Sequence, residues 1–561
     1  MKNILKNKLR AGLMACFMLS FFSCSKDLLK ETVISNIGND YINSPKGFED
    51  AVKAAYSSLR TFYGTQLGLT LTEYGTDIYA TGADGSYKGF HFYDAQLQPT
   101  VDYLFVVWDE LYKGINTCNA IIERAANVTG LPDATKKLRV AEAKFLRAHY
   151  YYILHQQFGG VDLRLTETIA PTKATKRASD AEMYTQIIKD CTEAIADLEN
   201  KGQSSDYGRA TKASAETLLA KVYLAKAYGP SKAADDFQKA ADLCAGIISK
   251  YNFKLLDDFA SVFDENNQVN AEVVYAVQYT TDQISNASNN SSGTDGGGNN
   301  LHLFFGMQYD IQPGMKRDVF YGRPFKRLRP TSFLLNTVFA ERVNDSRYQK
   351  TFRDLWKSNN PGANLNASFD NSKTKLTFAA GDTCIFIPGY EMSKEERATK
   401  KYQVLVPSAY NEALFPTLQK FFDTKRADLT EPRGSRDYFV WRLADIYLMQ
   451  SEALLKLGKV KEATDAINVV RSRAGFPGKK DAMKITESQM TFDFLMEERA
   501  RELAGEQTRW LDLKRWGLLV ERVKKYNPQA STIADKHYLR PIPQTQIDRS
   551  DPGAFAQNAG Y

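Results

Sequence analysis

The chain has 561 residues, of which 43% are hydrophobic and 25% are charged, so it is long enough to bury a large core and is not expected to be disordered. Its formal net charge is +7, with both signs scattered along the sequence. Nucleic-acid binding needs a concentrated basic face, and the sequence gives no support to that class of function.

The first 23 residues have the pattern of a signal peptide. Four basic residues precede an apolar run over residues 11–23, which is too short to span a bilayer but suits export. We predict cleavage before Cys24 and attachment of lipid to that cysteine, which would hold the mature protein at a membrane surface. Two alternatives stay open: lipid attachment at Cys16, and an ordinary secretory signal in which Cys24 is incidental.

The mature chain is expected to contain no transmembrane helix, because even its long apolar run near residue 440 is interrupted by Arg442 and Asp445. Its remaining cysteines are widely separated and form no C-x-x-C pair, so a zinc site is not expected. We predict small buried thiols, with two disulfides as the alternative. These cysteines are Cys118, Cys191, Cys244 and Cys384.

Helical periodicity dominates both ends of the chain. Apolar residues recur at helical spacing over residues 138–157, which are followed by "FGG", and over residues 210–227. Residues 443–454 and 463–474 predict an antiparallel helical hairpin, with Gly458 ending its first helix. Paired helices with small residues at close contacts resemble tetratricopeptide units, although no strict 34-residue period is present. The predicted fold class is mainly α, with a tetratricopeptide-like helical scaffold.

The stretch from about 273 to 430 differs from the ends: short apolar runs alternate there with Pro, Gly and aromatic residues. We expect it to be rich in loops. Its segment "NASNNSSGTDGGGNN" is read as a solvated loop and not as a phosphate cradle, because no G-K-[ST] follows. A second irregular stretch, residues 75–100, combines glycines with many aromatic residues.

The segment "EERARELAGEQTRWLDLKRWG" predicts an internal brace. Glu498 and Glu502 lie four residues apart, as do Glu497 and Arg501, so the helix can form ion pairs within itself. Exposed pairs of this kind would add little stability. Its arginines could clamp carboxylates or loop carbonyls through their planar forks; they are Arg499, Arg509 and Arg515. The tryptophans predicted to lie in the core are Trp108, Trp441, Trp510 and Trp516.

Nine motifs in order along the chain resemble the SusD/RagB family. They include "CSKDLL", "VWDELYKGINTCNAII", "AEAKFLRAHYYYILHQQFGG", "NDSRYQKTF", "RLADIYLMQSEALLKLG" and the terminal "QNAGY". The resemblance implies a lipoprotein on the outer-membrane surface of Bacteroidetes that lies over a SusC-like TonB-dependent barrel. It implies capture of oligosaccharides, or of peptides in RagB-like members, for import without a cofactor.

The same resemblance sets the expected domain organisation. We expect a signal peptide at 1–23 and one SusD-like domain at 24–561. Its tetratricopeptide-like parts would cover about 45–260 and 435–530, and its loop-rich, ligand-binding part about 273–430. A bound calcium ion cannot be judged from the sequence, and no metal site is predicted.

A surface glycan hydrolase is the alternative from another class. Glycosidases need two carboxylates across a cleft, and sequence spacing can neither reveal nor exclude such a pair. The chain contains no G-x-S-x-G elbow and no H-E-x-x-H motif. His149 and His155 lie six residues apart and are expected to be satisfied by neighbours. We therefore predict binding without catalysis.

Saccharide binding uses aromatic faces with polar groups around them, and the sequence offers two candidate clusters. The first, in residues 75–100, contains Tyr79, Tyr87, Phe90, His91, Phe92 and Tyr93. The second contains Phe304, Phe305, Tyr309, Tyr321 and Trp356. Tyr87 and Tyr93 are predicted to form a stacking platform. For every one of these aromatics, packing beneath a loop is the alternative.

Overall fold

The computed structural model describes residues 41–203, 205–282, 286 and 298–561. The predicted signal peptide, Cys16 and Cys24 lie outside the described residues, as does most of the polar loop before residue 298. Within the described part of the chain, the helices are too short or too polar for any of them to cross a bilayer.

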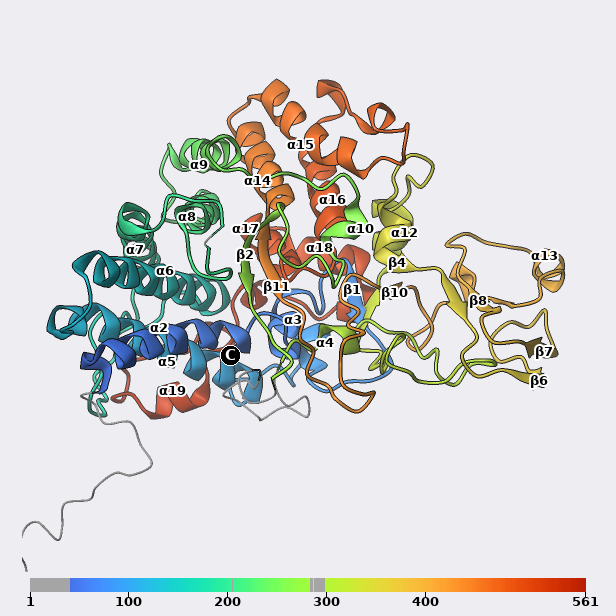
Figure 1. Ribbon diagram of the computed structural model, residues 1–561, viewed down its shortest axis with the longest axis horizontal. Coiled ribbons are helices and arrows are strands. Elements are labelled where there is room, and N and C mark those ends of the chain that lie inside the picture. Colours follow the sequence, from blue (N-terminus) through green and yellow to red (C-terminus); the bar gives the residue numbers. More distant parts are fainter. Residues whose placement is uncertain (1–40, 204, 283–285, 287–297) are drawn as a thin grey trace, which may run out of the picture.

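Helices make up most of the regular structure (Figure 1). The α-helices are α2 (Pro45–Ser57), α3 (Gln66–Thr72), α4 (Gly89–Phe92), α5 (Asp102–Arg124), α6 (Asp133–Phe158), α7 (Asp180–Asp197), α8 (Lys212–Lys226), α9 (Asp236–Lys250), α10 (Phe259–Val262), α12 (Arg347–Thr351), α13 (Lys394–Ala398), α14 (Leu443–Lys456), α15 (Val460–Ala474), α16 (Phe492–Leu503), α17 (Arg509–Arg515), α18 (Leu519–Tyr526) and α19 (Gln544–Asp548). A π-helix, η6, covers Phe333–Val338.

The strands are short, and each sheet has only two or three of them. They are β1 (Tyr79–Thr81), β2 (Val273–Val277), β3 (Leu328–Pro330), β4 (Phe352–Arg353), β5 (Leu355–Lys357), β6 (Gly362–Asn366), β7 (Lys375–Phe378), β8 (Thr383–Phe386), β9 (Gln403–Val404), β10 (Thr417–Leu418) and β11 (Tyr438–Arg442). The pairs β1–β3, β4–β10, β2–β11, β5–β8 and β6–β7 are antiparallel, and β8–β9 is parallel.

The long helices form a continuous row in which each packs on the next, from α5 through α6, α7, α8 and α9 to α14 and α15 (Figure 1). All the helices predicted from apolar spacing are present in this row, including the α14–α15 hairpin. Glycine ends two of them: Gly159 has φ +76° after α6, and Gly458 has φ +74° after α14. The mainly α, tetratricopeptide-like fold class is confirmed.

Aromatic side chains fill the core between the row of helices and the rest of the chain. Strand β11 carries Trp441, which stacks on His149 of α6 with ring centroids 5.0 Å apart. A hydrogen bond of 2.8 Å joins His149 Nε2 and the Tyr63 hydroxyl, and His155 contacts Asp180 at 3.0 Å, so each histidine has a polar neighbour as predicted, although His149 Nδ1 has none among the described residues. The predicted core tryptophans, Trp108, Trp441, Trp510 and Trp516, are all buried. The thiols predicted to be buried are buried and free.

The brace predicted over residues 497–517 is present, but it works differently. Arg509 clamps the Asp77 carboxylate with two hydrogen bonds of 2.7 Å. The helix does form an ion pair within itself, but with another partner: among the described ion pairs, Arg501 pairs with Glu498 and not with Glu497. The reason is burial. Glu498 and Glu502 are fully buried and face arginines from other elements, so these are not exposed surface pairs.

Candidate functional site

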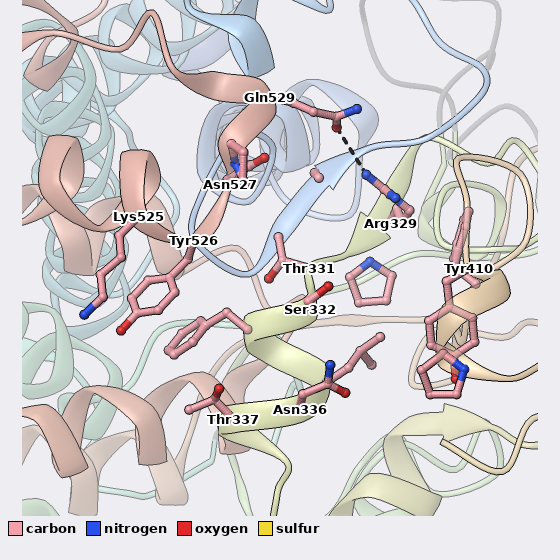
Figure 2. A pocket seen from close by; sticks show the side chains of 17 residues that line it. Arg329, Thr331, Ser332, Asn336, Thr337, Tyr410, Lys525, Tyr526, Asn527 and Gln529 are labelled. Atoms are coloured by element: carbon pink, nitrogen blue, oxygen red, sulfur yellow. Dashed lines mark hydrogen bonds between the residues drawn. The ribbon is translucent and has the colours of Figure 1, made fainter. Parts of the chain in front are cut away.

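A pocket of about 530 Å³ lies where four distant chain segments meet, beside the π-helix (Figure 2). We call it the η6 pocket, and its volume is within the range of small-molecule sites. Its 17 lining residues are Ala80, Arg329, Pro330, Thr331, Ser332, Phe333, Leu335, Asn336, Thr337, Pro407, Tyr410, Phe415, Lys525, Tyr526, Asn527, Pro528 and Gln529.

One wall of the pocket begins at strand β3. In the antiparallel pair β1–β3, Ala80 lies opposite Arg329. Leu328 and Pro330 are buried, whereas Arg329 is half-buried, because successive side chains of a strand point to opposite faces. The strand therefore turns the Arg329 guanidinium away from the core and toward the pocket, as Figure 2 shows.

The π-helix η6 forms the next part of the wall. Thr331 fixes its start: its hydroxyl donates to the Asp77 carbonyl at 2.7 Å and accepts from the Leu334 amide at 3.3 Å. The Phe339 amide bonds to the Leu334 carbonyl five residues earlier, which is the π-type pattern. The wide turn buries its apolar residues and leaves polar side chains exposed at the pocket. The exposed ones are Ser332, Asn336 and Thr337.

The opposite wall comes from the end of α18. Pro528 follows the helix, and Asn527 ties its end to the β1 segment by donating to the carbonyls of Thr76 at 2.9 Å and Tyr79 at 3.3 Å. Tyr526 stacks on Phe333 of η6, with ring centroids 3.8 Å apart and planes at 23°. The pocket thus has a rigid aromatic pair set by two elements that are far apart in the sequence.

Hydrogen-bonding side chains extend along the rim. Arg329 Nη2 donates to Gln529 Oε1 at 3.2 Å, and Gln529 Nε2 donates to Glu412 Oε1 at 3.1 Å (Figure 2). Burial lowers the pKa of the Arg329 guanidinium, and the charge of Glu412 acts in the opposite direction. An arginine remains protonated at neutral pH, so Arg329 presents a positive charge there.

This lining can bind a polyhydroxylated ligand but lacks the groups for hydrolysis. Hydroxyls, amides and cations surround Tyr526, the half-buried ring of the stacked pair, and this combination matches the polar and apolar sides of a sugar ring. None of the 17 lining residues, all in the described part of the chain, is Asp or Glu. A glycosidase needs two carboxyl groups across its cleft. The pocket is therefore arranged for binding and not for acid–base catalysis.

The first predicted aromatic cluster is mostly covered. Tyr79, Phe90, His91 and Tyr93 are at most 2% exposed, and only Tyr87 and Phe92 of this cluster are half-buried. The Tyr93 hydroxyl donates to the Gly75 carbonyl at 3.0 Å. Tyr87 instead stacks on Tyr103, with centroids 3.7 Å apart. The two tyrosines form no common platform in this structure, because one ring belongs to the core.

The second predicted cluster is brought together, but as a hydrophobic core. Tyr309 stacks on Trp356 at 4.7 Å, and the Tyr321 and Trp356 centroids are 5.0 Å apart. These rings are at most 7% exposed, and Phe304 and Phe305 are also buried. Their faces are covered by the loop-rich part that they stabilise. Packing beneath a loop, the alternative interpretation, describes both clusters except at Tyr87 and Phe92.

A second, wider groove of about 1020 Å³ runs along α5 and is lined by Trp108 and Tyr112. Trp108 is only 4% exposed, and its indole donates to Gln546 Oε1 at 3.2 Å. Four of the charged side chains in this groove already form two ion pairs: Lys113 lies 2.9 Å from Asp109, and Arg164 lies 2.5 Å from Asp162. Its polar groups are thus less available to a ligand than those of the η6 pocket.

The sequence analysis missed the η6 pocket entirely. Most of its polar residues are of ordinary surface types, and its lining comes from segments near residues 80, 330, 410 and 527. A π-helix has no distinctive sequence pattern that we could have used. The only local signal was Pro528, two residues after the last residue of an amphipathic helix, which marks a helix end but not a site.

Comparison with known proteins decides the family. The protein-family model described as "SusD family" matches residues 271–561, more than half of the chain. The chain belongs to the SusD family. A second model, described as "Starch-binding associating with outer membrane", matches residues 42–224. The resemblance inferred from the nine motifs is therefore confirmed.

Individual relatives are similar over most of their length. SusD-like protein P25 of Formosa agariphila is 25% identical over 97% of this chain and 98% of its own. Starch-binding protein SusD of Bacteroides thetaiotaomicron is 24% identical over 77% of this chain and 74% of its own. A solved structure entitled "Laminarin binding SusD-like protein" has 23% identity and a TM-score of 0.66, covering 92% of this chain and 100% of that one. At that identity, the match shows the fold.

Proposed function

We propose that this protein captures oligosaccharides at the outer-membrane surface and delivers them to a SusC-like TonB-dependent transporter. The observation that carries the proposal is the η6 pocket, where exposed hydroxyl and amide groups surround the stacked Phe333–Tyr526 pair without a lining carboxylate. A sugar offers its hydroxyls to these polar groups and a C–H face to Tyr526, the half-buried ring of the pair.

The relatives support a carbohydrate as the cargo. One of the curated relatives is a starch-binding protein, and a structure of the same fold is a laminarin-binding protein. The description of the matched N-terminal family model names association with the outer membrane. A lipid on Cys24 would supply the attachment, and the row of helices would supply a broad surface for the transporter.

Binding without hydrolysis is part of the proposal. The cargo would leave the pocket chemically unchanged, since the 17 lining residues offer no carboxylic acid to protonate a glycosidic oxygen. A glycan hydrolase would release new reducing ends from the bound polymer. We expect none on incubation of the purified protein with any polysaccharide that it binds.

The test is native electrophoresis in gels that contain single polysaccharides or a peptide mixture. We expect retardation by at least one polysaccharide. Tyr526→Ala should weaken that retardation about tenfold, because it removes one ring of the stacked pair. Asn336→Ala, at an exposed position, tests the same pocket with little risk to folding. Tyr390→Ala is the control, as Tyr390 is 57% exposed and does not line the pocket.

Two outcomes would contradict the proposal. Retardation by peptides and by no polysaccharide would favour the peptide-binding alternative. Equal retardation of the Tyr526, Asn336 and Tyr390 variants and the unaltered protein would show that sugar binds elsewhere on the molecule.

A further inference from the structure

The described side chains that line the η6 pocket carry positive charge and no negative charge. Its lining includes two cations, Arg329 and Lys525, and no Asp or Glu among its 17 described residues. Figure 2 shows the two cations on opposite sides of the view, with η6 between them below. A ligand that fills the pocket therefore lies between two positive charges.

In the part of the chain that the structure describes, no carboxylate directly contacts the Arg329 guanidinium to balance its positive charge. Among the described residues, Arg329 forms no ion pair, and its terminal nitrogen Nη2 donates to the neutral side chain of Gln529. Glu412 lies one hydrogen bond further away, beyond Gln529. A half-buried guanidinium that has lost part of its water is stabilised by an anion placed at its donors.

Lys525 supplies the second charge from another element. It is exposed in the last turn of α18, and its ammonium group lies 4.9 Å from the centroid of the Tyr526 ring. It forms no ion pair among the described residues. The α5 groove differs in this respect, because Lys113 and Arg164 there are paired with Asp109 and Asp162 at its own surface.

We propose that the η6 pocket selects oligosaccharides that carry anionic groups, as sulfate esters or as carboxylates of uronic acids. This inference rests on the proposed function and deepens it by naming the class of glycan. Arg329 binds the anionic oxygens through its planar fork, and Lys525 acts as a point charge on the opposite side. Tyr526 and the exposed side chains of η6 contact the rest of the sugar.

Pairs of polysaccharides that differ only in charge test the inference. Suitable probes are a sulfated galactan with its desulfated form, and a polyuronate with its carboxyl-reduced form. We expect the charged member of a pair to be bound at least tenfold more tightly than its neutral form. The two pairs distinguish sulfate from carboxylate. Raising the salt concentration from about 0.05 M to about 0.5 M should weaken this binding, since salt screens exposed charges.

Variants assign the effect to the pocket. Lys525→Gln should weaken binding of the charged glycan about three- to fivefold, and Arg329→Gln about tenfold. The matched control is Lys524→Gln, which removes the neighbouring exposed lysine of α18 outside the pocket and should change nothing. Since Lys525 is exposed, its variant folds even where Arg329→Gln does not.

The results distinguish a failure of this inference from a failure of the proposed function. If neutral forms bind as tightly as charged ones, or if Lys525→Gln behaves like Lys524→Gln, selection of anionic glycans is wrong and oligosaccharide capture stands. If no polysaccharide of either kind is bound, the proposed function fails and this inference fails with it.

Discussion

Single buried residues have their charge state set by their surroundings, and His149 is the simplest case. Its ring is fully buried between Tyr63 and Trp441. Burial lowers the pKa of His149 from 6.5 to about 3, and the positive charge of Lys221 acts in the same direction. The folded protein therefore holds this imidazole neutral at any pH near neutrality.

This burial predicts how stability depends on pH. The folded pKa of about 3 lies below the unfolded value of 6.5, so the contribution of His149 is complete above pH 6.5 and is lost as the pH falls toward 3. His149→Phe keeps a ring against Trp441 and removes the titration. Between pH 6 and 4, the unaltered protein should lose about 1.4 kcal/mol per pH unit relative to the variant.

Urea unfolding of both proteins across this pH range measures the difference. Other titrating groups contribute equally to both proteins and cancel. The hydrogen bond to Tyr63 that the variant loses lowers its unfolding free energy by the same amount, about 1–3 kcal/mol, at every pH. Parallel stability curves for the two proteins would show that the pKa of His149 is not lowered.

At the scale of an element, helix α16 connects separate parts of the chain through buried charges. Glu502 accepts hydrogen bonds from Arg347 of α12 at 2.8 Å and from Arg442 at the end of β11 at 2.6 Å, and it also pairs with Arg473 of α15. Surrounding arginines lower the pKa of Glu502 to about 2 despite its burial. One carboxylate thus joins the loop-rich part to the helical hairpin and the β2–β11 pair.

Glu502→Gln should lower the unfolding free energy by about 3–5 kcal/mol, because it removes a counter-charge that three buried arginines share and leaves them with fewer carboxylates. The control is Asp465→Asn, which breaks an exposed pair with Lys461 on α15 and should cost less than about 1 kcal/mol. Chemical denaturation of both variants gives the comparison. Equal losses would mean that burial adds nothing to the value of these ion pairs.

At the scale of the whole molecule, the proposed role depends on how the protein is attached. Cys24→Ala should abolish incorporation of a labelled fatty acid and move the mature protein into the soluble fraction, since the acyl chains provide the attachment. Cys16→Ala is the matched control and should leave both unchanged. Loss of labelling in the Cys16 variant alone would place the lipid at the earlier cysteine.

The sequence by itself determined the helical scaffold. Helices α6, α8, α14 and α15 were predictable because apolar residues at helical spacing are a local pattern, and the glycines after α6 and α14 mark their ends. The order of motifs determined the family for the same reason, since each motif can be read without knowing its neighbours in space.

Only the tertiary structure decided which aromatics are covered and where a pocket forms. Composition cannot distinguish a buried ring from an exposed one, so Tyr309, Tyr321 and Trp356 were equally acceptable as core or as binding residues until their packing was seen. The η6 pocket joins β3, η6 and the end of α18, which are far apart in the sequence. Contacts between distant segments follow from the packing of the whole chain, and no local pattern encodes them.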